Sequence, residues 1–240
     1  MNDEGLIGEA RQFATELSAT VQGLVPDCAP FSVQSVGRRI AVEQEPGTGI
    51  PLRVTGRPLL TLKVVMHLEG DTSGQYLAVE SSNFVVYEGD RAAGEPLFRY
   101  DYVRSPVSEI PAAHLQLHAH RDAIAYVMAQ TGTSSARGKR RAKKASVPHL
   151  AELHFPLGGH RFRPCLEDLL EMLVSEFGVD CSKEGREALR RGREKWRRQQ
   201  TRSVVRDAPQ DAVDILRELG YRIEPPAPEP ASNVARLRAL

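Results

Sequence analysis

The feature of this sequence that most constrains its fold is a run of short apolar segments between residues 31 and 120. Turn residues separate these segments, and no helical pattern interrupts them. Strands joined by short connections pair most readily with their chain neighbours as antiparallel strands. The sequence therefore predicts an antiparallel meander sheet. The expected strands are residues 31–44, 59–68, 76–80, 84–87, 97–103 and 115–120, with a further strand at 150–155.

Amphipathic helices are predicted on both sides of this meander, where apolar side chains recur at three- and four-residue spacings. The expected helices are 6–24, ended by Pro26; a short one at 121–130; 166–177, ended by Gly178; about 182–204, capped by Ser182; and one capped by Asp207 and ended by Gly220. The predicted fold class is α+β, an antiparallel meander sheet with an N-terminal helix and a C-terminal helical extension.

Three parts are expected along the chain. They are an α+β sheet domain at 1–180 that includes a basic loop at 132–147, a basic helical extension at 181–223, and a Pro- and Ala-rich, poorly ordered tail at 224–240. Residues 1–132 carry 10 Lys and Arg against 16 Asp and Glu, whereas residues 133–240 carry 22 against 15. This asymmetry indicates either an anionic partner for the basic half or an attraction between the halves.

Several classes of protein are excluded by what the sequence lacks. Three cysteines without a Cys-x-x-Cys pair argue against a disulfide framework and against a thiolate zinc site. No apolar run is long enough to span a membrane, and the acidic N-terminus does not have the pattern of a secretory signal. No phosphate-binding or dinucleotide-binding motif is present. We therefore expect a cytoplasmic protein with no membrane contact and no cofactor.

A histidine-rich segment is the most distinctive candidate site. Side chains alternate between the two faces of a strand, so His114, Gln116, His118 and His120 are predicted to share one face. If the strand at 97–103 pairs with this segment, Arg99 and Asp101 are expected beside His118 and His120. His154 is expected on the next strand, and His114 is expected at the periphery.

Three interpretations of this cluster compete. The first is a solvated sheet face that happens to be rich in histidine. The second is a general acid–base site in which Asp101 orients an imidazole and Arg99 holds a phosphate. The third is a metal site held by His118 and His120 with His114 or Asp101, although the arginine would repel a cation. Phosphate chemistry without a metal is favoured over metal binding.

Two basic elements favour a nucleic acid as the partner. The loop at 137–144 holds six cations in eight residues, and the helix that follows 182 is also rich in arginine. Such segments can neutralise a phosphate backbone. The expected contacts are Arg137, Lys139, Arg140, Arg141, Lys143, Lys144, Arg190, Arg193 and Arg197. On the helix, Leu189 and Trp196 lie seven residues apart and define a narrow docking seam.

The order of three short motifs resembles the TumE-like toxins of bacterial toxin–antitoxin pairs. The motifs are Arg99-Tyr100-Asp101 on a strand, His118-Ala119-His120, and the helix start Leu166-Glu167-Asp168-Leu169-Leu170. The resemblance covers about residues 75–177. It implies a metal-independent action on RNA, with Arg99, Asp101, His118 and His120 as the functional residues. The basic loop and the helical extension are additions to that pattern.

The leading hypothesis is a nucleic-acid-directed protein, more specifically an RNA-directed endoribonuclease-like toxin or defence component. His118 and His120 would transfer protons, Arg99 would hold the phosphate and Asp101 would orient an imidazole, with His154 nearby. One rival is a non-enzymatic DNA-binding or assembly protein that uses the basic C-terminal helices. A third possibility is a subunit that binds a protein partner through those helices, by the Leu189–Trp196 seam or the tail.

Overall fold

The computed structural model describes residues 3–36, 39–44, 47–71, 76–106, 110–119, 139–140, 143 and 149–239. The strands are β1 (Phe31–Val36), β2 (Arg39–Gln44), β3 (Ile50–Val54), β4 (Arg57–Gly70), β5 (Leu77–Glu88), β6 (Phe98–Val103), β7 (Ala113–Leu117) and β8 (Phe155–Pro156). The helices are α1 (Asp3–Gln22), the 3-10 turn η1 (Leu150–Glu152), α4 (Leu166–Phe177), α5 (Lys183–Asp207), α6 (Pro209–Glu218) and α7 (Val234–Arg238). The α+β fold class is confirmed.

The strands form one antiparallel sheet in the order β1-β2-β4-β5-β6-β7-β8. The long strand β4 organises this sheet, because β5 runs along one side of it and both β2 and β3 pair with the other. The β3–β4 hairpin turns at Thr55 and Gly56, whose φ angles of 49° and 79° suit a tight hairpin turn. Asp180, which follows α4, accepts hydrogen bonds from the backbone N–H groups of both turn residues.

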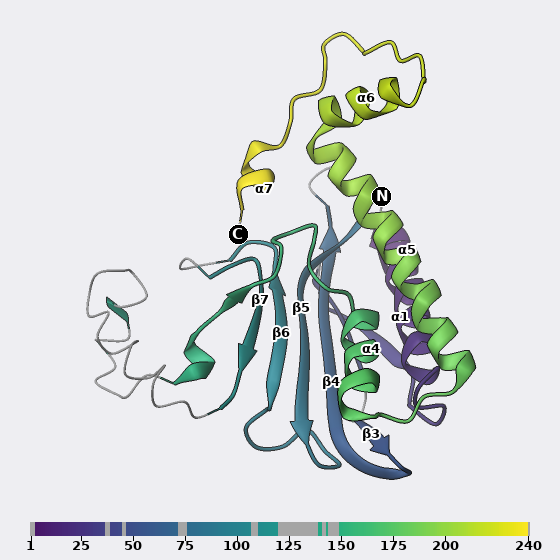
Figure 1. Ribbon diagram of the computed structural model, residues 1–240, viewed down its shortest axis with the longest axis vertical. Helices are drawn as coiled ribbons and strands as arrows, with labels where there is room; N and C mark the ends of the chain where they lie inside the picture. The colour runs from purple at the N-terminus through teal and green to yellow at the C-terminus, as the bar shows by residue number, and fades with distance from the viewer. Residues whose placement is uncertain are drawn as a thin grey trace.

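One face of the sheet is covered by helices (Figure 1). Alternate side chains of β4 point to this face and are buried, from Leu60 through Leu62, Val64 and Met66 to Leu68. They share a core with the apolar stripes of α1 and α4, in which Val21, Leu170 and Leu173 are completely buried. Each large apolar side chain buried in this way contributes about 1.5–3 kcal/mol. We call the opposite side of the sheet the outer face.

Helix α5 packs against α1 and α4, and in Figure 1 it crosses α1 and runs beside α4. Leu189 anchors it with a side chain that has no exposed area, and Gly185 brings its first turn against Gly23 at the end of α1. Arg193 joins α5 to α4 through ion pairs with Asp168 (2.8 Å) and Glu171 (3.3 Å). Since Leu189 is buried within the chain, the predicted Leu189–Trp196 seam is not free to bury Leu189 against a partner.

The main helices follow the sequence patterns closely. Helix α4 spans the predicted residues 166–177 and ends at Gly178, whose φ of 70° gives the left-handed cap that glycine favours. Ser182 caps α5 as expected, by accepting a hydrogen bond from the Gly185 N–H at 3.0 Å. The predicted cap at Asp207 is wrong. Asp207 is the last residue of α5, and its buried side chain pairs with Arg161. Helix α6 begins at Pro209, and its N-cap residue is Ala208.

Several of the predicted strands differ from the strands in the structure. Residues 31–44 form two strands, because Val36 pairs with Arg39 and the chain reverses between them. The predicted strands at 76–80 and 84–87 are one strand, β5, because Ser81, Ser82 and Asn83 are paired on both sides. Strand β3 is an additional strand. It contains Pro51, and proline is tolerated in an edge strand such as this one. The strand predicted at 150–155 is η1 followed by β8.

The remaining boundaries concern the histidine segment and the C-terminal part. Strand β7 is Ala113–Leu117, so its ordered pairing begins earlier and ends earlier than the predicted 115–120. The tail that was expected to be poorly ordered contains the short helix α7, capped by the side chain of Asn233. The helix predicted at 121–130 and most of the loop at 132–147 lie outside the described residues. Within the described ranges, no helix combines the length and apolar character needed to cross a membrane.

Candidate functional site

A buried carboxylate, Asp101 on β6, lies at the centre of the candidate site. One carboxylate oxygen accepts a hydrogen bond from Asn83 Nδ2 on β5 at 2.8 Å. The other is 2.9 Å from Arg99 Nε and 3.5 Å from His114 Nε2 on β7. Burial by itself raises the pKa of Asp101, but the hydrogen bonds from His114 and Asn83 and the charge of Arg99 outweigh it. The pKa of this carboxyl therefore lies below its ordinary value, and Asp101 is ionised at neutral pH.

His114 is the direct partner of this carboxylate. The two residues are opposite one another in the β6–β7 register, and both side chains are almost completely buried. The other ring nitrogen of His114, Nδ1, lies 2.9 Å from the backbone carbonyl oxygen of Pro111. Each ring nitrogen of His114 therefore faces an oxygen acceptor. Asn83 and Arg99 therefore hold the carboxylate of this pair, and the Pro111 carbonyl holds its imidazole.

A second histidine, His154, completes the cluster from the segment between η1 and β8. Its ring packs on that of His114, with 4.7 Å between the ring centres. Its Nε2 lies 2.8 Å from Gln116 Nε2, and the same amide nitrogen donates to the carbonyl of Ala151 at 2.8 Å. Gln116 Oε1 accepts a hydrogen bond from Arg99. We call Asn83, Arg99, Asp101, His114, Gln116 and His154 the outer-face cluster.

The cluster contains Arg99, Asp101 and His154 from the predicted site but a different histidine as the partner of Asp101. The register sets Asp101 opposite His114 and Arg99 opposite Gln116, so neither of them lies directly opposite His118. His118 follows the end of β7 and lies 3.3 Å from Glu95 through Nδ1. His120 lies outside the described residues. His114, expected at the periphery, is the central imidazole.

Sequence patterns missed Asn83, His114 and Gln116 as members of the cluster. Period-two alternation did place His114 and Gln116 on the histidine face, but it could not determine which of them lies opposite Asp101. A shift of two residues in register leaves every side chain on its face and changes every partner. Asn83 carried no signal, because the strand that contains it was predicted to be interrupted there.

Solvent reaches two of the charged or titratable side chains of the outer-face cluster. The Asp101 and His114 side chains are buried, whereas the Arg99 side chain is 39% exposed and His154 is partly exposed. Arg99 and His154 are therefore the groups that a ligand could reach. Among the described residues, no group of three or more His, Cys, Asp or Glu side chains is arranged to hold a metal ion.

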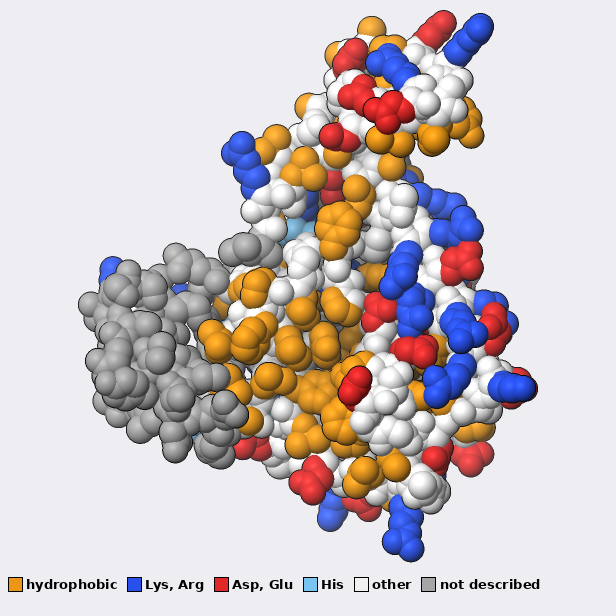
Figure 2. Space-filling model, in the orientation of Figure 1, with side chains coloured by type: hydrophobic (Ala, Val, Ile, Leu, Met, Phe, Trp, Pro, Cys, Tyr) orange, Lys and Arg blue, Asp and Glu red, His pale blue; other side chains and the backbone are white. Residues whose placement is uncertain are grey.

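The predicted nucleic-acid contacts fall in two places. Of the basic loop, Lys139, Arg140 and Lys143 are described and exposed, while Arg137, Arg141 and Lys144 lie outside the described residues. On α5, the side chains of Arg190 and Arg197 are exposed to solvent, whereas that of Arg193 is committed to α4. Figure 2 shows Lys and Arg side chains gathered along α5, with acidic side chains among them.

A second cluster of aromatic and cationic side chains lies where the loop before α4 meets α5. The Arg163 guanidinium is 3.6 Å from the centre of the Tyr102 ring and 5.0 Å from that of Trp196. It also donates to the carbonyl of His160, whose ring meets Tyr102 edge to face. Burial, chiefly, lowers the pKa of Arg163 to about 10, so this side chain still carries its charge at neutral pH.

His160 in this cluster makes stability depend on pH. Burial, with the charges of Arg236, Arg161 and Arg163, lowers its pKa from 6.5 to about 4. The folded state then binds fewer protons than the unfolded state between these values, so stability is lost as pH falls from 6.5 to 4. We expect this residue to account for about 3 kcal/mol over that window. Urea unfolding of wild type and His160→Gln at pH 4 and 6.5 checks this, and an equal pH dependence of both proteins would contradict it.

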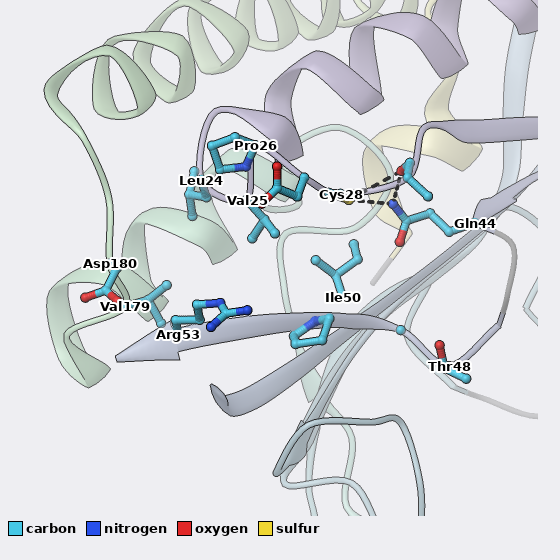
Figure 3. Close-up of a pocket in the computed structure, with 14 residues that line it drawn as sticks. Leu24, Val25, Pro26, Cys28, Gln44, Thr48, Ile50, Arg53, Val179 and Asp180 are labelled. Atoms are coloured by element: carbon cyan, nitrogen blue, oxygen red, sulfur yellow. Dashed lines mark hydrogen bonds between the residues drawn. The ribbon is translucent and has the colours of Figure 1, made fainter. Parts of the chain in front are cut away.

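A cavity of about 410 Å³ lies apart from both clusters, between the α1–β1 connection and β3 (Figure 3). Arg53 and Asp180 lie at one end of it, and Cys28 and Gln44 lie at the other (Figure 3). The Gln44 amide hydrogen-bonds the thiol at 2.6 Å. Burial raises the pKa of the Cys28 thiol above its ordinary value despite this bond, so the thiol is protonated and unreactive at neutral pH.

Comparison with known proteins identifies no family for this chain. No family model matches it, and no curated protein or solved structure is significantly similar to it. The resemblance to the TumE-like toxins therefore stays a prediction.

Proposed function

We propose that this protein is nucleic-acid-directed and binds RNA through the exposed arginines of α5. The observation that carries the proposal is the charge of this helix, which holds ten Lys and Arg against four Asp and Glu. Lys183, Arg190 and Arg197 are seven residues apart, two helical turns, so they lie on one face. Arg191 and Arg198 repeat the same spacing beside them.

The carboxylates among these arginines do not cancel the attraction. Glu187 lies 3.7 Å from both Arg190 and Arg191, and Glu194 lies 2.7 Å from Arg198, but all these side chains are mostly exposed. Exposed ion pairs contribute at most about 1 kcal/mol, so a phosphate can replace the carboxylate. The exposed Lys139, Arg140 and Lys143 add a second cationic element. A cytoplasmic location agrees with an RNA partner and belongs to the same proposal.

The salt dependence of binding tests the role of α5. Each phosphate neutralised on a single strand adds about 0.7 to the slope of log affinity against log salt concentration. We therefore expect the double variant Arg190→Gln/Arg197→Gln to lower this slope by up to about 1.4. The measurement is fluorescence anisotropy of a labelled single-stranded RNA at several salt concentrations.

The matched control is Arg57→Gln/Arg91→Gln, which removes two exposed arginines that lie outside α5. The control variant is expected to keep the wild-type slope. An identical loss in both variants would mean that net charge rather than α5 attracts the RNA, and absence of binding at low salt would reject the proposal.

A second candidate is cleavage of the bound RNA at the outer-face cluster. The observation that favours it is that Gln116 links Arg99, which pairs with the ionised Asp101, to His154. Arg99 would hold a phosphate of the RNA, and His154 would transfer a proton in the cleavage step. Asp101 and His114 would hold Arg99 and His154 in position. RNA that stays intact after incubation with the protein would leave binding alone as the function. Binding of a protein partner through the C-terminal helices stays a prediction, for which α6 offers the exposed Ile215 and Leu216.

A further inference from the structure

The surface beside α5 contains a groove of about 510 Å³. One wall is the loop that leads into α4, which contributes Arg161, Phe162 and Arg163. The other wall is the middle of α5, which contributes Trp196, Arg197 and Gln200. This volume lies within the range of small-molecule sites, about 300–1,000 Å³, and exceeds the size of one nucleobase.

Two aromatic rings line this groove. Phe162 is 77% exposed, the highest value among the large apolar side chains of the described residues, and no packing requirement explains it. Trp196 is partly buried, and Arg163, which is itself stacked on Tyr102, lies 5.0 Å from the centre of its ring. Flat, polar aromatic ligands such as nucleobases stack on aromatic rings that are accessible in one groove in this way.

The polar groups of the groove match the rest of a nucleotide. Among the residues that the structure describes, Gln200 Oε1 is buried and has no hydrogen-bond partner, so the side chain gains an acceptor interaction when it rotates into the groove and meets an N–H from the edge of a base. Arg161 is held by Asp207 at 2.6 Å. Arg197 is 69% exposed, and its nearest carboxylate oxygen is 3.6 Å away, so it can turn to a phosphate at the mouth of the groove.

We propose that this groove binds an unpaired nucleobase and thereby makes the protein select single-stranded RNA. The inference rests on the proposed function, because it specifies which form of RNA the cationic face of α5 receives. In a duplex, the bases are stacked on one another and cannot enter a groove of this kind. Electrostatic attraction alone would favour the duplex, because its phosphates are more closely spaced.

The single tryptophan of the chain, Trp196, provides a direct measurement. We expect a ten-nucleotide oligouridylate to quench the Trp196 fluorescence. An abasic oligomer of the same length and charge is expected to bind more weakly and leave the fluorescence unchanged. Phe162→Ala is expected to weaken oligouridylate binding about tenfold and not to change the affinity for the abasic oligomer, because stacking requires the base. The exposure of Phe162 means that this substitution removes little packing.

The matched control is Phe177→Ala, an exposed phenylalanine at the opposite end of α4, which is expected to bind both oligomers as the wild type does. Equal affinity for the base-containing and abasic oligomers, or wild-type binding by Phe162→Ala, would overturn the groove inference and leave binding by α5 intact. Equal affinity for single-stranded and duplex RNA would also overturn it. Failure of every oligomer to bind would instead reject the proposed function itself.

Discussion

Asp101→Asn is expected to lower the free energy of unfolding by about 1–3 kcal/mol, because it leaves buried donors around this position without a carboxylate acceptor. The carboxylate accepts from Asn83 and lies between Arg99 and His114. An amide offers a single acceptor oxygen, and its NH₂ group would face donors. Urea unfolding at neutral pH measures the loss.

The control for this substitution is Asp90→Asn. Asp90 also faces an arginine, Arg91, but at 3.9 Å and with both side chains more than 70% exposed. The same chemical change there is expected to alter stability by no more than about 0.5 kcal/mol. Similar effects at the two positions would mean that the burial of Asp101 contributes nothing.

Asp101→Asn is also expected to change how the free energy of unfolding depends on pH in acid. Because the pKa of Asp101 is lowered in the folded state, its stabilisation is complete above its ordinary pKa of 3.8 and is lost as pH falls further. Asp101→Asn is therefore expected to flatten the pH dependence of stability below about pH 4. The window for His160 lies above this value, so the two contributions can be separated.

Gly185→Ala is the second substitution with a large expected effect. A Cβ atom at this position would lie 2.2 Å from the carbonyl oxygen of Gly23 and 3.1 Å from the Cys181 sulfur. Both helix backbones would have to separate, and α5 would lose its close contact with the end of α1. We expect a loss of about 3 kcal/mol, although alanine is intrinsically the better helix former by about 1 kcal/mol.

The control for Gly185 is Gly8→Ala in α1, where a Cβ atom would meet nothing within 4 Å. There the same substitution is expected to stabilise the protein by about 0.5–1 kcal/mol through helix propensity. Opposite signs in thermal or urea unfolding would show that close approach of the helices determines the effect. A stabilised Gly185→Ala would show that α1 and α5 are not in contact there.

The sequence by itself determined the elements that depend on local rules. Helix α4 has its leucine stripe, its acidic first turn and its terminal glycine, and α5 has its serine cap; these patterns act within a few residues of chain. The antiparallel order of the sheet followed in the same way from strands joined without helices between them. In β5 a neighbour outweighed local preference, because pairing on both sides carries the strand through Ser81 and Asn83.

Only the tertiary structure decided which residues meet. Alternation places His114 and His118 on the same face of a strand, but the pairing of β6 with β7 selects His114 as the partner of Asp101. The groove likewise joins Phe162 and Trp196, which are far apart in the chain, because α5 folds back over α4. The physical reason is the same in both cases. Local periodicity fixes the direction of a side chain, whereas its partner depends on register and packing, which only the assembled chain determines.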